Sequence, residues 1–180
     1  MATIVVGGGE RGVGKTALVC GLIAALPEFR WTAVKISGHD HGKAEPVSEE
    51  TQAGQGTDTA RYLAAGACRS FLMTSGDEEL GRALTRFLRN PTLAGHLIFE
   101  SNRIPRHLRP DLCLAVAGGF ESGRKLSFSA LLQCADATVE ISDRDRVLFD
   151  ARGEKPLFHL ASFQRISPPM LAWIRERVPL

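Results

Sequence analysis

Short apolar runs rich in β-branched residues alternate along the chain with Ala- and Leu-rich stretches. The runs predict strands at residues 3–8, 32–37, 68–74, 96–101, 112–118, 138–142 and 156–162. Helical spacing predicts helices at residues 14–26, 57–65, 77–89, 127–135 and 167–178. Near-continuous apolar strands separated by helices predict an α/β fold, a mostly parallel central sheet with helices on both faces.

Polar stretches follow two of these strands. Residues 38–56 combine four glycines with several ionisable side chains, and residues 118–125 follow a later strand. In a mostly parallel sheet the carboxyl ends of the strands lie along one rim, where ligands bind. Long polar loops in compact domains are uncommon and are usually functional or disordered. We therefore expect residues 38–56 to form a lid over the functional rim.

Composition narrows the class of protein. The 180 residues include 44% hydrophobic and 23% charged side chains with a net charge of +2, which predicts one domain over residues 1–180. The near balance of positive and negative charges gives no indication of nucleic-acid binding. No apolar run reaches the length needed to span a membrane. Four cysteines in apolar surroundings without a C-x-x-C pair look like buried hydrophobes and favour the reducing cytoplasm.

One segment carries specific chemistry. Gly9-Glu10-Arg11-Gly12-Val13-Gly14-Lys15-Thr16-Ala17 matches G-x-x-x-x-G-K-T, the P-loop or Walker A motif, between a strand and a helix. The loop amides and the helix N-terminus would face phosphate oxygens, Lys15 would neutralise phosphate charge, and the Thr16 hydroxyl would ligate Mg²⁺. We therefore predict these residues as the nucleotide site and Lys15 as catalytic.

A dinucleotide fingerprint is the competing interpretation, because Gly7, Gly9 and Gly12 also satisfy G-x-G-x-x-G. That fold places an acid after the second strand to bind the ribose. Residues 33–37 end without one, and no acid occurs before Asp40. The Lys15-Thr16 pair has no purpose in a dinucleotide site, so the P-loop interpretation is preferred.

Phosphoryl transfer also needs an acid that organises the metal, normally at the end of a neighbouring strand. Glu100 ends the apolar run over residues 96–100 and is expected to serve the metal and catalysis. Asp40 and Asp58 are expected as further metal groups, with Asp40 also a catalytic candidate; one of the two is enough. His39 and His41 flank Asp40, but solvated loop histidines are favoured over a zinc site.

Arginines could contact phosphate or an anionic substrate, and Arg11 and Arg61 are the two that merit testing. The base is left open between GTP and ATP. A guanine-selective protein would normally carry [NT]KxD after a late strand. Here Ser142-Asp143-Arg144-Asp145 keeps only the final Asp, which would either read guanine or cap a turn.

Several of these motifs together resemble the MobB family. They are residues 9–16, Val34-Lys35 followed by His39-Asp40-His41-Gly42, Asp58-Thr59-Ala60-Arg61 before Ala65-Gly66-Ala67, and Leu97-Ile98-Phe99-Glu100. The resemblance implies a dimeric, GTP-binding, weakly hydrolysing adaptor that assists an enzyme making the guanine dinucleotide form of the molybdenum cofactor. The sequence has Glu100-Ser101-Asn102 where the family has Glu-Gly.

A wider group that includes dethiobiotin synthetase is also similar, through Pro110-Asp111-Leu112 and Gly118-Gly119. That resemblance implies an ATP-dependent kinase or ligase for a small molecule, with Lys35, Asp40 and Arg61 lining the acceptor pocket. The sequence therefore leaves two classes open, a slowly hydrolysing adaptor and a transferring enzyme.

Overall fold

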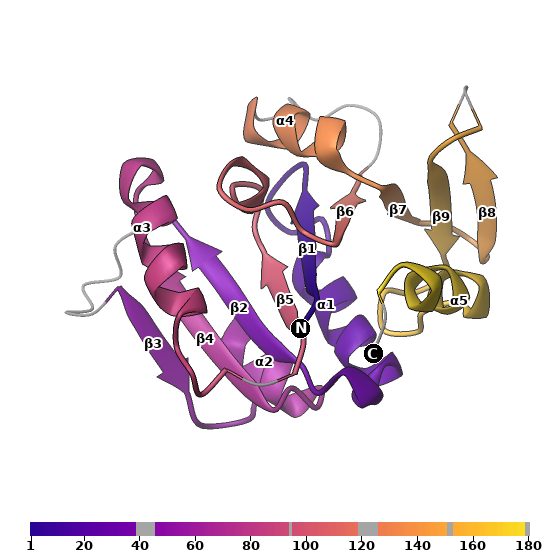
Figure 1. The fold of residues 1–180 in the computed structure, drawn as a ribbon. Coiled ribbons are helices and arrows are strands. Elements are labelled where there is room, and N and C mark those ends of the chain that lie inside the picture. The colour runs from indigo at the N-terminus through magenta and orange to yellow at the C-terminus, as the bar shows by residue number, and fades with distance from the viewer. Residues whose placement is uncertain (39–45, 94, 119–125, 151–152, 179–180) are drawn as a thin grey trace.

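The computed structural model describes residues 1–38, 46–93, 95–118, 126–150 and 153–178. Within these ranges one sheet has the strand order β3-β4-β2-β5-β1-β6-β7-β9-β8 (Figure 1). The strands are β1 (Thr3–Gly8), β2 (Thr32–Ser37), β3 (Val47–Glu50), β4 (Arg69–Thr74), β5 (Leu97–Glu100), β6 (Leu112–Val116), β7 (Ala137–Ile141), β8 (Arg146–Phe149) and β9 (Pro156–Leu160). Seven of them pair in parallel, and β3 and β8 pair antiparallel at the two edges.

Helices cover both faces of the sheet. They are α1 (Lys15–Ala25), α2 (Asp58–Ala64), α3 (Asp77–Leu88), α4 (Leu126–Cys134) and α5 (Pro168–Arg177), with short 3₁₀ turns η1 (Pro27–Phe29) and η2 (Ile104–Arg106). One core cluster joins α1, α2 and α5 to one face. A second cluster joins α3 and α4 to the other face. The predicted fold, a mostly parallel sheet with helices on both faces, is confirmed.

The two antiparallel edge strands were missed by the sequence interpretation. Residues 38–56 were expected to form one polar lid, but residues 47–50 are strand β3, paired with β4. The expectation of a continuous loop was therefore wrong, because Arg69 Nε and Nη2 hold the two Glu49 carboxylate oxygens at 2.7 Å and tie this polar segment to the sheet. The rest of the expected lid, residues 39–45, and residues 119–125 of the second polar stretch lie outside the described residues.

The cysteines differ from the expectation of four buried thiols. Cys113 is buried and Cys20 is half-buried, but Cys68 and Cys134 are exposed. Burial raises the pKa of the Cys113 thiol to about 12. No helix in the described part of the chain combines the length and apolar character that crossing a bilayer requires.

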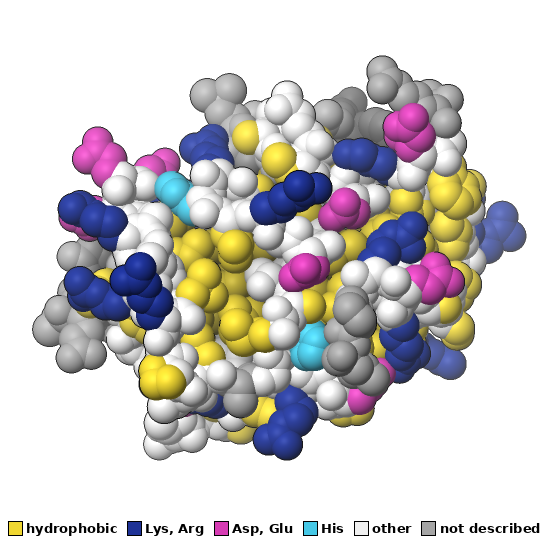
Figure 2. Space-filling view, in the orientation of Figure 1, with side chains coloured by type: hydrophobic (Ala, Val, Ile, Leu, Met, Phe, Trp, Pro, Cys, Tyr) yellow, Lys and Arg dark blue, Asp and Glu magenta, His cyan; other side chains and the backbone are white. Residues whose placement is uncertain are grey.

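Figure 2 shows the face covered by α3 and α4, on which side chains of both charges are present. Lys and Arg side chains gather toward α3 in this view, and the exposed Arg82, Arg86 and Arg89 belong to that helix and its C-terminal end. Acidic side chains at the start of α3, Asp77, Glu78 and Glu79, interrupt this basic surface. The face therefore carries mixed charge.

Candidate nucleotide site

The segment between β1 and α1 has the backbone that a P-loop requires. Gly12 and Gly14 have φ values of 83° and 102°, in the left-handed region that favours glycine. Gly14 precedes the first residue of α1, and a Cβ at this position would overlap the ring of Phe163. Both glycines are therefore needed for the turn that leads the chain into the helix.

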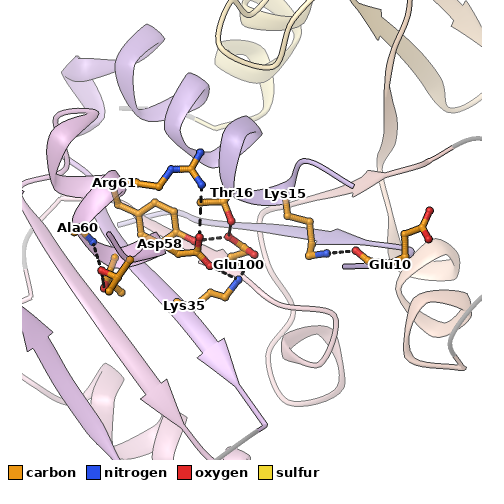
Figure 3. Close-up of polar contacts among 11 residues, drawn as sticks. Glu10, Lys15, Thr16, Lys35, Asp58, Ala60, Arg61 and Glu100 are labelled. Carbon is orange, nitrogen blue, oxygen red and sulfur yellow. Dashed lines mark hydrogen bonds and ion pairs between the residues drawn. The ribbon is translucent and has the colours of Figure 1, made fainter. Parts of the chain in front are cut away.

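Lys15 lies along this loop. Its Nζ donates to the backbone carbonyl of Glu10 at 2.6 Å, so the side chain folds back over the loop from the first turn of α1 (Figure 3). The remaining predicted nucleotide residues, Gly9, Arg11, Val13, Thr16 and Ala17, lie on the same turn, all partly or fully exposed. The predicted loop residues are thus together and accessible.

Glu100 ends β5 next to β1 and β2, and its carboxylate is only 2% exposed. Thr16 Oγ1 donates to Glu100 Oε2 at 2.8 Å, and the Tyr62 hydroxyl donates to the same oxygen. Lys35 Nζ donates to Oε1 (Figure 3). The structure therefore brings the P-loop threonine and the expected strand-end acid into direct contact.

Lys35 lies between two carboxylates. It is in register with Glu100 across the β2–β5 pair, and its Nζ is also 3.0 Å from Asp58 Oδ2. Burial by itself lowers the pKa of Lys35, but the adjacent carboxylates of Glu100 and Asp58 outweigh burial and raise the pKa. Arg61 Nη1 lies 3.7 Å from Asp58 Oδ1, so Arg61 also belongs to this cluster. The predicted residues Asp58, Arg61 and Glu100 are thus neighbours.

Tyr62 is a site residue that the sequence interpretation missed. It is fully buried on α2, and burial together with the Glu100 charge raises its pKa well above the ordinary value. Thr57 begins the helix, accepting from the Ala60 amide at 3.0 Å, and its hydroxyl donates to Glu50 of β3 at 3.2 Å. For Tyr62, the signal available in the sequence was that a buried tyrosine hydroxyl needs a polar partner.

Asn102 is a second missed residue. Its Oδ1 accepts from the Gly8 amide at 2.8 Å, and its Nδ2 donates to the Gly8 carbonyl at 3.0 Å. These two bonds join the segment after β5 to the end of β1, where the P-loop begins. Asn102 therefore attaches the start of the P-loop to the segment after β5.

A cavity of about 350 Å³ adjoins the P-loop. Its lining includes Glu10, Arg11, Gly12, Val13, Ala117, Gly118, Glu140, Ile141 and Phe163. These residues come from the P-loop and from the carboxyl ends of β6, β7 and β9. Asp145 accepts from the Ala161 amide at 2.7 Å, so its carboxylate links the segment after β7 to the end of β9.

Three expected groups cannot be placed. His39, Asp40 and His41 lie outside the described residues, so the catalytic and metal roles expected for Asp40 stay predictions. Among the described residues, no three or more His, Cys, Asp or Glu side chains gather as a metal cluster. The oxygen ligands that Thr16 and Glu100 offer are those that Mg²⁺ accepts alongside phosphates and water.

No protein-family model and no curated protein matches the chain. Among solved structures, LpxK from Aquifex aeolicus in complex with ATP is similar, with 20% identity and a TM-score of 0.50 over 78% of this chain. The chain spans about half the length of LpxK, 48% of that chain. A MobB homolog from Bacillus stearothermophilus matches with 19% identity and a TM-score of 0.48, covering 98% of this chain and 100% of that chain. The likeness to LpxK shows that the chain has the fold of P-loop nucleotide-binding proteins.

Proposed function

We propose that the chain binds a Mg²⁺-nucleoside triphosphate and hydrolyses it slowly. The observation that carries this proposal is the 2.8 Å hydrogen bond from Thr16 Oγ1 to Glu100 Oε2, immediately beside Lys15. Because Thr16 gives its proton to Glu100, its oxygen lone pairs are available to a cation. Mg²⁺, when bound, supplies neutralisation of the phosphate charge.

The hydrogen bonds that the Glu100 carboxylate already accepts support slow rather than fast hydrolysis. Thr16, Tyr62 and Lys35 all donate to its carboxylate, so both oxygens already accept hydrogen bonds. A general base must reach the proton of the attacking water. Glu100 is therefore better suited to hold the magnesium side of the site than to take a proton from water.

The cavity beside the P-loop favours guanine over adenine. Glu140 lines it with a side chain that is 28% exposed, and a carboxylate can accept from both N1–H and the 2-amino group of guanine. Ile141 and Phe163 offer apolar surface for the ring. His159 lies beside Glu140, with its Nε2 3.7 Å from Glu140 Oε2, and its Nδ1 accepts from Arg146 Nε at 2.6 Å.

For the biological role, we propose an adaptor in molybdenum cofactor biosynthesis that acts, as a dimer, on an enzyme making the guanine dinucleotide form. The support is the sequence resemblance, in which the residues of the D-T-x-R motif lie at the site: Asp58 pairs with both Lys35 and Arg61. The test is the rate of guanine dinucleotide formation by that enzyme. Addition of this chain with GTP should raise the rate, and no change would refute the role.

An ATP-dependent kinase or ligase is the second candidate. The observation that favours it is the presence of two cations outside the P-loop, Lys35 and Arg61, whose side chains are 23% and 33% exposed. They could hold an anionic acceptor beside the γ-phosphate. A nucleotide thermal-shift screen followed by metabolite additions separates the two candidates, because only the enzyme gains stability from an acceptor.

The nucleotide itself is tested by calorimetry with Mg²⁺-GTP and Mg²⁺-ATP. We expect tighter binding of GTP, and Glu140→Gln should reduce the GTP preference while leaving ATP affinity within about twofold, because the change removes one acceptor outside the phosphate site. Arg144→Gln, an exposed neighbour in the same region, is the matched control. Equal affinities of the wild-type protein for both nucleotides would overturn the guanine assignment.

A further inference from the structure

The two oxygens of the Glu100 carboxylate have partners of different kinds. Oε2 accepts from Thr16 and from Tyr62, which is fully buried. Neither of these hydroxyls has another acceptor among the described contacts. Oε1 accepts from Lys35, which is partly exposed. One oxygen is therefore fixed by hydroxyl groups, and the other is held by an ammonium group.

Lys35 differs from the other two donors because it already has a second acceptor. Asp58 Oδ2 lies 3.0 Å from Lys35 Nζ, at the first residue of α2 (Figure 3). The Asp58 side chain is 36% exposed, so the Lys35–Asp58 ion pair can tighten without moving either charge deeper into the protein. Lys35 can thus leave Glu100 by a small side-chain movement and remain paired.

A divalent cation bound at Thr16 would lie close to this ammonium group. Thr16 and Lys35 contact opposite oxygens of one carboxylate, so a cation at Thr16 and the Lys35 ammonium would be like charges a few ångströms apart, which repel. Lys35 and the cation would therefore compete for the single negative charge of Glu100. Tyr62 does not compete, because its hydroxyl is neutral.

We propose that Lys35 exchanges with the nucleotide-bound divalent cation at Glu100 Oε1, and that Asp58 is the positioning residue that receives Lys35. Asp58 then acts through Lys35 and does not ligate the metal. Tyr62 keeps the carboxylate in place during the exchange. This inference rests on the proposed function, binding of a metal-nucleotide at the P-loop, and it deepens that function by assigning the carboxylates different tasks.

The test is a double-mutant cycle on Asp58 and Lys35, with Mn²⁺ as the probe. Electron paramagnetic resonance measures Mn²⁺ affinity in the presence of saturating GDP, which is not hydrolysed. Asp58→Asn should weaken Mn²⁺ binding about tenfold, because Lys35 loses its second negatively charged partner and stays on Glu100. Lys35→Met should bind Mn²⁺ at least as tightly as wild type. In the Lys35→Met background, Asp58→Asn should have no further effect.

Equal losses of Mn²⁺ affinity from Asp58→Asn in both backgrounds would show that Asp58 ligates the metal. No loss in the wild-type background would show that Asp58 does not receive the Lys35 ammonium group. Either result overturns the inference. Glu28→Gln, which removes the acid of the distant Arg175 pair, controls for loss of a carboxylate. Lys35→Gln repeats the cycle if Lys35→Met does not fold by circular dichroism. Absence of any nucleotide-dependent Mn²⁺ site in the wild-type protein would instead refute the proposed function.

Discussion

At the scale of single residues, Glu100 is the centre of the site. Its carboxylate is buried and accepts from three side chains that come from α1, α2 and β2. Burying a charge without partners is costly, so these donors make an ionised Glu100 tolerable inside the protein. The hydrogen bond from Thr16 to Glu100 also joins the P-loop to the carboxyl end of β5.

Substitution of Glu100 by glutamine tests this role. Glu100→Gln keeps the shape but removes the charge, so metal-free nucleotide affinity should be unchanged while Mg²⁺-dependent turnover falls about tenfold to a hundredfold, the scale for a group that supports a metal site. Phosphate release measures turnover, and circular dichroism checks folding. Glu49→Gln, in the exposed pair with Arg69, is the control. If Glu100→Gln keeps the wild-type turnover rate, Glu100 has a structural role only.

Tyr62 gives a pH-dependent prediction. It is the single tyrosine of the chain, so the tyrosinate absorbance band reports this residue alone. Burial, followed by the Glu100 charge, raises the pKa of Tyr62 above its ordinary value of about 10. Above that value the unfolded chain releases the proton and the native protein retains it, so Tyr62 contributes stability below pH about 10 that is lost as pH rises further.

We therefore expect the tyrosinate band to appear only as the protein unfolds. Tyr62→Phe should also flatten the fall in unfolding free energy as the pH rises above about 10, relative to wild type. Ionisation of the tyrosine near its ordinary pKa in the folded protein would contradict the buried hydrogen bond to Glu100.

The residues most accessible to sequence reasoning were those with a spaced motif. Lys15 and Thr16 are fixed by G-x-x-x-x-G-K-T, and Glu100 stood out as an acid ending an apolar run. Tyr62 and Asn102 have no such pattern, because their partners are 38 and 94 residues away in sequence. Their roles depend on tertiary contacts that local spacing does not encode.

At the scale of elements, the strands and helices that bury apolar residues were predictable, and the two edge strands were not. Strand β3 reads Val-Ser-Glu-Glu; Val47 packs partly buried against the core, and Glu49 is held by hydrogen bonds and an ion pair with Arg69. Strand β8 leaves Leu148 and Phe149 exposed. β3 is polar and β8 is only four residues long, so neither gives the run of apolar residues that identifies a buried strand.

Asn102 links two elements, and its removal has a predictable cost. Asn102→Ala loses both hydrogen bonds to Gly8 and should lower the unfolding free energy by about 1–3 kcal/mol. It should also weaken nucleotide binding, because the P-loop loses its attachment to the segment after β5. Chemical denaturation and calorimetry measure the two effects. Asn90→Ala, which removes a local bond to Thr92, should leave nucleotide affinity unchanged; equal affinity in both variants would contradict the role of Asn102.

At the scale of the whole molecule, the sheet order explains why residues distant in sequence meet. β1 lies between β5 and β6, and β5 lies between β1 and β2, so the carboxyl ends of these strands adjoin at one rim. The alternation of strands and helices predicted this rim. It could not predict which side chains on the rim face one another, because that depends on register: Lys35 and Val6 both align with Glu100.

We expect the dependence of nucleotide binding on Mg²⁺ to be a property of this assembled rim. Thr16→Ala removes a metal ligand but leaves the loop amides and Lys15 in place, so it should weaken nucleotide binding in the presence of Mg²⁺ far more than in its absence. Calorimetry in Mg²⁺ and in chelator gives the comparison. Equal losses in both conditions would mean that Thr16 serves the loop rather than the metal.

The central claim is that residues 9–17 form a working P-loop, and Lys15→Ala tests it most directly. Lys15 contacts the Glu10 carbonyl and is partly exposed, so its loss should not unfold the protein. Calorimetry with Mg²⁺-GTP and Mg²⁺-ATP should show binding to the wild-type protein and none to a Lys15→Ala variant whose circular dichroism is unchanged. Unchanged nucleotide affinity in that variant would contradict the account.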